Sequence, residues 1–384
     1  MFKFFKMIVG IDASNIREGG GLTHLIALLQ NTEETTTDID KIIVWSSNAT
    51  LDKIPSSKKI EKVSHSFLNK STLFTFIYQF FYLKKSAKKR NCKVIFAPGG
   101  TFISSFRPFV TMSQNMLPFE WEEAQYYGWK MRLRLKILHY TQTYSFKRAN
   151  GLIFLTNYAK NYITKAISLK KSSTIIPHGV NPAFRAAPRK QNAPSFYNHE
   201  KPFEFLYVSY VTVYKHQWVI AEAVCQLHQN GLPIKLKLIG SVLDSFEKVQ
   251  QVLDNYPNSN ECIEYIAGLP HSQLIEHYHQ ADAFVFGSTC ENMPIILIEA
   301  MSAGLPIASS YYGPMEEVLE YAAFYFNPRE VKDCKMVLEN LFNNPEARRL
   351  GALTVFNQTK KYTWVNCATD TFKYLVEVAN NYKK

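Results

Sequence analysis

Short apolar runs alternate with longer amphipathic stretches in the first half of the chain. The runs suit buried strands and the stretches suit helices, so this βαβ pattern predicts a parallel sheet covered on both faces. The predicted strands cover residues 7–11, 41–45, 94–97, 109–112, 152–155 and 174–176. The predicted helices cover residues 22–30, 72–90, 128–148 and 158–167.

The segment 182–202 interrupts this pattern with four prolines among basic and polar residues, which is typical of a linker. The pattern then resumes, so the sequence predicts two Rossmann-like α/β domains in tandem. The second set of strands covers 203–208, 234–239, 263–265, 283–286, 306–308 and 323–326. The second set of helices covers 217–229, 245–255, 271–279, 294–302, 331–342 and 364–382.

The composition is that of a globular protein. The chain has 384 residues, of which 46% are hydrophobic and 20% charged, and this excludes an intrinsically disordered chain. No apolar run reaches the length of a membrane span, and residues 1–10 are too short and too basic for a signal peptide. The six cysteines are scattered, so we expect free thiols in a reducing compartment. The sequence therefore predicts a cytoplasmic protein.

The net charge of +12 is unevenly distributed. Residues 1–195 carry 29 Lys and Arg against 11 Asp and Glu, a net charge of +18. Residues 196–384 carry 15 against 21, a net charge of −6. A basic half attracts anions such as nucleic acid, a membrane surface or a phosphorylated substrate, and the alternative is a lysine-rich solvated surface.

Three motifs follow predicted strands, where the loops of parallel sheets bind ligands, and with two such domains we expect a site in the cleft between them. The first motif is Gly19-Gly20-Gly21, between the predicted strand 7–11 and the helix 22–30. Glycines let a backbone approach a ligand closely, and the following helix N-terminus favours anions. The motif is not G-x-G-x-x-G, so it does not support a nicotinamide cofactor, and a flexible loop is the alternative.

The second motif is the segment 209–216, after the predicted strand 203–208. Lys215 immediately precedes the predicted helix 217–229 there. A lysine beside a helix N-terminus is well placed to bind a diphosphate, and an ordinary surface lysine is the alternative.

The third motif begins at Glu291 and continues through a predicted helix, with Pro294 in its first turn and Gly304 and Pro306 at its end. Glu299 lies inside this otherwise apolar helix, where a carboxylate needs a partner. A ribose diol offers two donors to Glu299, and a hexose hydroxyl could do the same for Glu291. The alternatives are a helix-terminus carboxylate for Glu291 and an internally paired core carboxylate for Glu299.

The spacing of Glu291 and Glu299 within ENMPIILIEAMSAGLP resembles the donor-site signature of retaining glycosyltransferases with the GT-B fold. The sequence is most similar to glycosyltransferase family 4, the glycosyl transferases group 1. The sequence IPHGV at 176–180 resembles the domain-junction motif of this family. LYVS at 206–209 with Lys215 resembles its first C-terminal-domain strand and diphosphate loop. The triple glycine resembles its N-terminal loop, and 364–382 resembles its last helix.

The resemblance implies an N-terminal acceptor domain over 1–195 and a C-terminal donor domain over 196–363. The last helix, in 364–384, would cross back to the N-terminal domain. It also implies retaining transfer from a nucleoside diphosphate sugar, without a metal ion or another cofactor. The implied catalytic residues are Glu291 and Lys215. The implied donor-binding residues are Gly20, Ser209, Lys215, Glu291, Asn292, Met293, Pro294 and Glu299.

In this family the first glutamate contacts the donor sugar and the second contacts the ribose, which implies these roles for Glu291 and Glu299. Lys215 and the amides near Met293 and Pro294 would hold the diphosphate. Lys215 and the helix N-terminus would then stabilise the negative charge that develops on the leaving group.

Two positions depart from the family pattern. Tyr210 stands where the family usually has an arginine, so one cation for the diphosphate is missing or comes from elsewhere. Gln114-Asn115 stands where the family often has His-Asp. Gln114 does not titrate near neutral pH, so we expect Gly19, Gln114 and Asn115 to orient the sugar or the acceptor.

The predicted helix 128–148 combines six basic residues with Trp129 and several aliphatic residues. This composition suits an anionic membrane surface, although basic residues at spacing two spread around a helix, and a solvated helix covering the sheet is the alternative. We expect an enzyme of lipopolysaccharide or surface polysaccharide synthesis that acts on a glycan or lipid-linked acceptor, peripheral on the inner face of a membrane. The alternatives are a sugar-nucleotide epimerase of the same fold and a basic nucleic-acid-binding protein, although no nucleic-acid-binding module is recognised.

Overall fold

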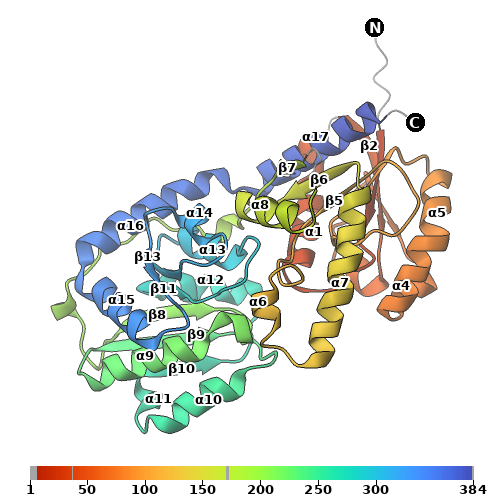
Figure 1. Ribbon diagram of the computed structural model, residues 1–384. Coiled ribbons are helices and arrows are strands. Elements are labelled where there is room, and N and C mark those ends of the chain that lie inside the picture. Colours follow the sequence, from red (N-terminus) through yellow and green to blue (C-terminus); the bar gives the residue numbers. More distant parts are fainter. Residues whose placement is uncertain (1–6, 37, 170–172, 383–384) are drawn as a thin grey trace. The chain divides into compact units, whose positions relative to one another are not determined.

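The structure is a computed structural model that describes residues 7–36, 38–169 and 173–382 (Figure 1). The chain folds into two compact units, each built on one parallel sheet. Unit 1 consists of Met1–Ala124, Gly128–Gly179 and Thr363–Lys384, and unit 2 of Gln125–Tyr127 and Val180–Tyr362. The predicted class, α/β with two Rossmann-like domains, is confirmed. The first six residues of the segment 1–10 lie outside the described residues.

Unit 1 contains a seven-stranded parallel sheet with the strand order β3-β2-β1-β4-β5-β6-β7. The strands are β1 (Met7–Asp12), β2 (Ile39–Trp45), β3 (Ile60–Val63), β4 (Val94–Ala97), β5 (Phe109–Met112), β6 (Gly151–Phe154) and β7 (Ser173–Ile175). The helices are α1 (Gly19–Gln30), α2 (Thr32–Thr35), α3 (Asn48–Leu51), α4 (Thr72–Tyr78), α5 (Lys84–Lys89), α6 (Trp121–Ala124), α7 (Trp129–Arg148) and α8 (Asn157–Ala166). A π-helical turn, η2 (Gln79–Leu83), joins α4 to α5.

The last helix, α17 (Trp364–Asn381), belongs to unit 1, where it packs against α1, α2 and β4. Its start fits closely against the junction motif, because a Cβ on Gly179 would come within 2.2 Å of the backbone nitrogen of Trp364. Only glycine therefore lets these two backbones approach one another so closely. Residues 383–384 of the predicted C-terminal segment lie outside the described residues.

Unit 2 contains a six-stranded parallel sheet with the strand order β10-β9-β8-β11-β12-β13. The strands are β8 (Phe203–Val208), β9 (Ile234–Ile239), β10 (Ile263–Ile266), β11 (Ala283–Phe286), β12 (Ile307–Ser310) and β13 (Phe324–Phe326). The helices are α9 (Gln217–Gln229), α10 (Phe246–Asn255), α11 (Ser259–Cys262), α12 (His271–Gln280), α13 (Ile295–Ser302), α14 (Met315–Leu319), α15 (Val331–Asn343) and α16 (Pro345–Gln358).

The segment 182–202 packs onto unit 2 instead of hanging free as a linker. The guanidinium of Arg348, a fully buried residue, donates to the side chain of Gln191 and to the carbonyl oxygen of Asn192. The ring of Phe184 is also fully buried and packs against the ring of Tyr278. These contacts explain why unit 1 ends at Gly179, before the boundary of 195 that we placed from the sequence.

Among the described residues, no helix is both long enough and apolar enough to cross a membrane.

Candidate active site

The sheet of unit 2 reverses its winding direction between β8 and β11. The chain runs from β8 outward to β9 and β10 and then returns to β11, on the other side of β8. In open parallel sheets, ligands bind beside the loops that follow the two strands at such a reversal. Lys215 follows β8 and Glu291 follows β11, so two predicted donor residues lie at this position.

Lys215 and Glu291 form an ion pair. The Nζ atom of Lys215 contacts Oε1 of Glu291, which also accepts a hydrogen bond of 2.7 Å from Oγ of Ser288. The side chains of Lys215 and Glu291 are only 8% and 15% exposed. The Nζ atom also lies 4.8 Å from the centre of the Phe286 ring. The lysine ammonium is therefore held in a poorly hydrated place, where its interaction with an anion is stronger than in water.

Hydrogen bonds connect the loop after β8 to the loop after β11. The hydroxyl of Tyr207 donates to the carbonyl oxygen of Lys215 at 2.6 Å and accepts from the amide of Gly287 at 3.3 Å. The amide of Thr289 donates to the carbonyl oxygen of Tyr214 at 2.8 Å. Burial, and then the charge of Glu291, raise the pKa of Tyr207 well above its usual value, so this phenol stays neutral. These hydrogen bonds therefore hold the two loops in fixed positions relative to one another.

His216 stands at the N-terminus of α9, directly after Lys215. It adopts a left-handed conformation with φ of 50°, and its Nε2 atom lies 3.2 Å from Oγ1 of Thr289. Burial, followed by the positive charges of Arg329 and Lys248, lowers the pKa of His216 to about 4. His216 is therefore neutral at physiological pH and adds no cation to the site.

The loop 291–294 leads into α13. Asn292 and Met293 are buried, and the helix begins at Ile295 with Pro294 as its N-cap residue. The predicted start of this helix at Pro294 was one residue early. The first amides of a helix have no intrahelical acceptor and carry partial positive charge, so this end of α13 favours a bound anion.

Glu299 is 1% exposed and has two partners inside unit 2. Its Oε1 atom lies 2.7 Å from Nε2 of His271, and its Oε2 atom accepts a hydrogen bond of 3.2 Å from the hydroxyl of Tyr278. These contacts are the ones expected if Glu299 is an internally paired core carboxylate, the alternative to binding a ribose. Since the side chain of His271 is 47% exposed, a ribose would reach Glu299 beside this imidazole or in its place. The ribose-binding role of Glu299 stays a prediction.

Ser209 and Tyr210 directly follow the strand β8. The side-chain amide of Gln217 donates through Nε2 to Oγ of Ser209 and to the carbonyl oxygen of Tyr210, both at 2.8 Å. These bonds fix the start of the loop that carries Lys215. The side chain of Tyr210, where the family usually has arginine, is 46% exposed.

The remaining predicted residues lie in unit 1. The helix α1 begins at Gly19, so the triple glycine is its first turn and not the loop before it, which corrects the predicted helix start at residue 22. A Cβ on Gly21 would come within 2.9 Å of Oε1 of Gln114, so the glycine turn and Gln114 lie together. Asn115 is exposed, and its side chain accepts from the amide of Leu117 at 3.0 Å.

Sequence reasoning missed the residues that support the predicted site, above all His271 and Tyr278. A signal was present, because these residues stand seven positions apart on a predicted helix and therefore share one face of it. This spacing alone did not show that the shared face of the helix would pack against Glu299. Ser288 and Thr289 were also missed, because the partners of loop residues depend on tertiary structure.

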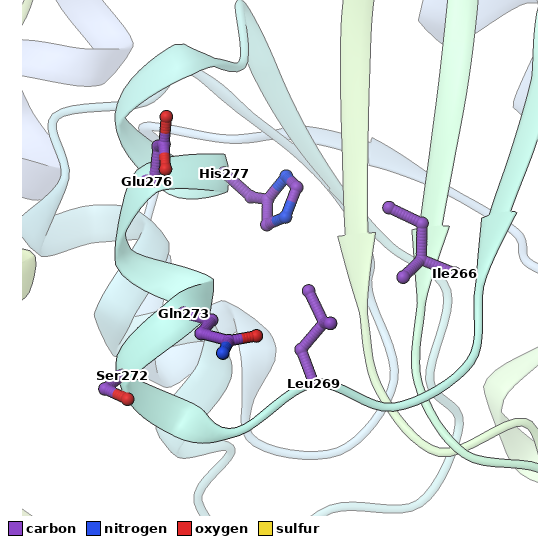
Figure 2. Close-up of a pocket in the computed structure, with 6 residues that line it drawn as sticks. All are labelled: Ile266, Leu269, Ser272, Gln273, Glu276 and His277. Atoms are coloured by element: carbon purple, nitrogen blue, oxygen red, sulfur yellow. The ribbon is translucent and has the colours of Figure 1, made fainter.

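An open pocket of about 460 Å³ lies between α12 and the end of β10 (Figure 2). Figure 2 shows the side chains of Leu269 and His277 between the helix and Ile266. Ser272, Gln273 and Glu276 complete the lining. None of the predicted site residues lines it.

A family model described as Glycosyl transferases group 1 matches residues 189–351, which run from the segment before β8 into α16. The Glycosyl transferases group 1 match is therefore shown for residues 189–351, which make up less than half of the chain. Over these residues the match agrees with the predicted family and with the predicted enzyme class, glycosyltransferase.

The curated relatives of this chain are distant. The sulfoquinovosyl transferase SQD2 of Arabidopsis thaliana is 26% identical over 155 residues, 37% of this chain and 30% of the relative. The O-antigen chain mannosyltransferase B of Escherichia coli is 28% identical over 109 residues, 28% of this chain and 29% of the relative. The chain thus matches less than a third of the length of either relative.

Solved structures match over nearly the whole chain. The Anabaena protein Alr3699/HepE, crystallised in complex with UDP, has a TM-score of 0.70 and 15% identity, and the match covers 97% of this chain and 100% of that one. At this identity the similarity shows the fold, and it confirms the predicted GT-B fold.

Proposed function

We propose that this chain transfers a sugar, with retention of anomeric configuration, from a nucleoside diphosphate sugar to a glycan or lipid-linked acceptor. The reaction would serve the synthesis of a surface polysaccharide or lipopolysaccharide. The proposal includes a cytoplasmic location and peripheral attachment to the inner face of a membrane.

One observation carries the proposal. The Lys215–Glu291 pair stands beside the N-terminus of α13, at the point where the sheet of unit 2 reverses direction. A diphosphate would place its negative charge between the ammonium of Lys215 and the first amides of α13. Both would stabilise the additional charge that develops when the bond between sugar and phosphate breaks. Glu291 would then face the hydroxyl groups of the donor sugar.

The ion pair also indicates what would change when a donor binds. Glu291 compensates the charge of Lys215. Burying this charge without a partner would be costly, because the Lys215 side chain is only 8% exposed. A bound diphosphate would take over part of this compensation and leave the carboxylate of Glu291 to accept hydrogen bonds from the sugar. Asn292 and Met293 are the buried residues of the loop 291–294 and would anchor Glu291 beside the start of α13.

Two of the similar proteins support the choice of ligand and pathway. HepE was crystallised with UDP, which favours a uridine diphosphate as the first nucleotide to test. The Escherichia coli relative adds mannose to an O-antigen chain, which favours a polysaccharide acceptor.

A panel of UDP-, GDP- and ADP-sugars, followed by product analysis, tests the proposal. We expect one donor to raise the melting temperature of the protein and to be consumed in the presence of a glycan or lipid-linked acceptor. An epimerase would convert the sugar nucleotide without any acceptor, and a nucleic-acid-binding protein would retain DNA or RNA on a filter. Stabilisation by no sugar nucleotide in the panel would refute the proposal.

A further inference from the structure

Helix α7 exposes five large apolar side chains in one line. Trp129 is 70% exposed and Tyr140 is 68% exposed, and three further residues of the helix are each more than half exposed. The five residues are Trp129, Leu133, Ile137, Tyr140 and Tyr144, and we call them the α7 face. A single exposed apolar residue is ordinary on a protein surface, whereas a contiguous exposed set indicates an interaction site.

The spacing of the α7 face follows the helix. Successive members stand four, four, three and four residues apart, so at 3.6 residues per turn they fall within one narrow stripe. The buried residues of α7, among them Leu135, Gln142 and Phe146, lie on the opposite side of the helix and anchor it to unit 1. The stripe is therefore a second apolar face, beyond the one that the fold itself buries.

Basic residues border the α7 face on both sides. By the same helical geometry, Arg132 and Lys136 flank one edge of the stripe, and Lys130 and Arg134 flank the other. All four are exposed, and α7 contains no acidic residue. The even spacing of the charges, which made the sequence ambiguous, thus places them along the two borders and leaves the stripe apolar.

We propose that the α7 face docks on an anionic lipid bilayer. The aromatic and aliphatic side chains would enter the interfacial region, and the bordering Lys and Arg side chains would contact acidic headgroups. Charge complementarity favours this partner over a second copy of the chain, since two α7 faces in contact would bring like charges together. The inference deepens the membrane-attachment part of the proposed function, and its test does not require transfer.

Co-sedimentation of the full chain with vesicles tests this proposal. We expect binding to phosphatidylcholine vesicles containing about 30% phosphatidylglycerol, weak binding to phosphatidylcholine alone, and weaker binding in about 0.5 M salt. The double variant Trp129→Ser, Tyr140→Ser should lose about tenfold or more in affinity for the anionic vesicles. The double variant Arg132→Gln, Lys136→Gln should weaken binding and reduce its dependence on salt.

Tyr321 and Leu350 provide a matched control, because both are exposed apolar residues but lie in unit 2. The double variant Tyr321→Ser, Leu350→Ser should bind vesicles like the unaltered protein. Unchanged binding by the Trp129→Ser, Tyr140→Ser variant would overturn the proposal, as would equal binding to both kinds of vesicle. A lipid-free dimer that this variant dissociates would show that a second copy covers the face instead.

Each variant should keep its melting temperature and its response to sugar nucleotides, since no residue of the α7 face belongs to the predicted donor site. This measurement separates the two proposals. A protein that responds to a sugar nucleotide but ignores vesicles retains the proposed transfer and loses the docking surface. A protein that binds vesicles through the α7 face but responds to no sugar nucleotide retains the surface and loses the transfer.

Discussion

The Nε2 atom of His271 lies 2.7 Å from Oε1 of Glu299, and the two residues come from different helices, α12 and α13. Tyr278 binds the second carboxylate oxygen of Glu299 from the next turns of α12. The ring of Phe184 packs against His271. This arrangement fixes the orientation of the one carboxylate inside an otherwise apolar helix.

The pair predicts a pH dependence of stability. The hydrogen bond to Glu299 raises the pKa of His271 above its ordinary value of 6.5. The bond therefore contributes stability that is fully present below pH 6.5 and is lost as the pH rises through the folded-state pKa. We expect His271→Gln to lower the melting temperature at pH 5.5 more than at pH 8.5.

His279 is the control for this measurement, because it lies on the same helix but bonds the carbonyl oxygen of Phe184. His279→Gln should show no comparable change in its effect between the two pH values. An equal effect of His271→Gln at both pH values would mean that the imidazole and Glu299 do not form a charged pair.

If Glu299 binds the ribose, removing its carboxylate and removing the ribose hydroxyls of the ligand disrupt the same contact. The two losses of binding free energy should therefore not add. We expect Glu299→Gln to weaken binding of a nucleoside diphosphate by about 1–3 kcal/mol, and to have little effect on its 2′,3′-dideoxy analogue. Calorimetric titration of both ligands into both proteins gives this cycle. Equal losses with the two ligands would assign Glu299 to the structure of unit 2 alone.

His24 and His178 form a buried pair in unit 1, with their Nδ1 atoms 3.1 Å apart. Burial lowers the pKa of His24 from 6.5 to about 4, and burial and then His24 lower that of His178. The unfolded chain binds these protons near pH 6.5, so stability is complete above that value and falls as the pH drops toward 4. We expect His24 alone to remove on the order of 2–3 kcal/mol over this range.

Urea unfolding between pH 7 and pH 4 measures this loss. Because a variant without the imidazole cannot take up the proton, His24→Asn should flatten the acid limb of the stability curve. Exposed His199 provides a control whose replacement by Asn should leave the limb unchanged. An acid limb that is as steep in His24→Asn as in the unaltered protein would contradict the assignment.

Arg348 should be essential to the packing of the segment 182–202. Its guanidinium donates to the carbonyl oxygens of Leu341 and Phe342 in α15 and to that of Asn192. A lysine cannot reach all of these acceptors, and buried carbonyl groups would lose their partners. We expect Arg348→Lys to cost about 2–4 kcal/mol in the free energy of unfolding.

The neighbouring Arg349 gives a matched control, because it is exposed and bonds to Glu346 on the surface of α16. Arg349→Lys should change the free energy of unfolding by less than about 0.5 kcal/mol. Limited proteolysis reports on the same packing. If the segment were a free linker, Arg348→Lys and the unaltered protein would be cut within it equally fast.

The sequence predicted the sheets well where strands are buried on both faces. β4 and β11 are continuous apolar runs with every residue buried, and both were predicted at their observed bounds. β3 was missed because Ile60–Val63 is a half-buried edge strand with Glu and Lys at its centre. α16 was missed because Pro345 and Gly351 interrupt its pattern, although Pro345 occupies the first turn, where proline is tolerated.

The candidate site was predictable only in part. Lys215 and Glu291 could be found because each follows a predicted strand, and such loops gather at one edge of a parallel sheet. The direct contact of Lys215 with Glu291 depends on tertiary packing, and so do the partners of Glu299. Neither can be predicted from the spacing of residues along the sequence. The proline-rich segment 182–202 was predicted to be a linker for the same reason. The buried Arg348 that holds it on unit 2 lies far along the chain and could not be recognised as its partner.

Calorimetric titration of UDP, GDP and ADP into Lys215→Gln and Lys237→Gln tests the central claim most directly. Lys237 is the matched control, because it also forms a largely buried ion pair in the sheet of unit 2, with Glu204 at 2.9 Å. We expect Lys215→Gln to weaken binding of the preferred nucleotide by about tenfold or more, and Lys237→Gln to leave it unchanged. Equal affinities in Lys215→Gln and the unaltered protein would contradict a diphosphate site at Lys215.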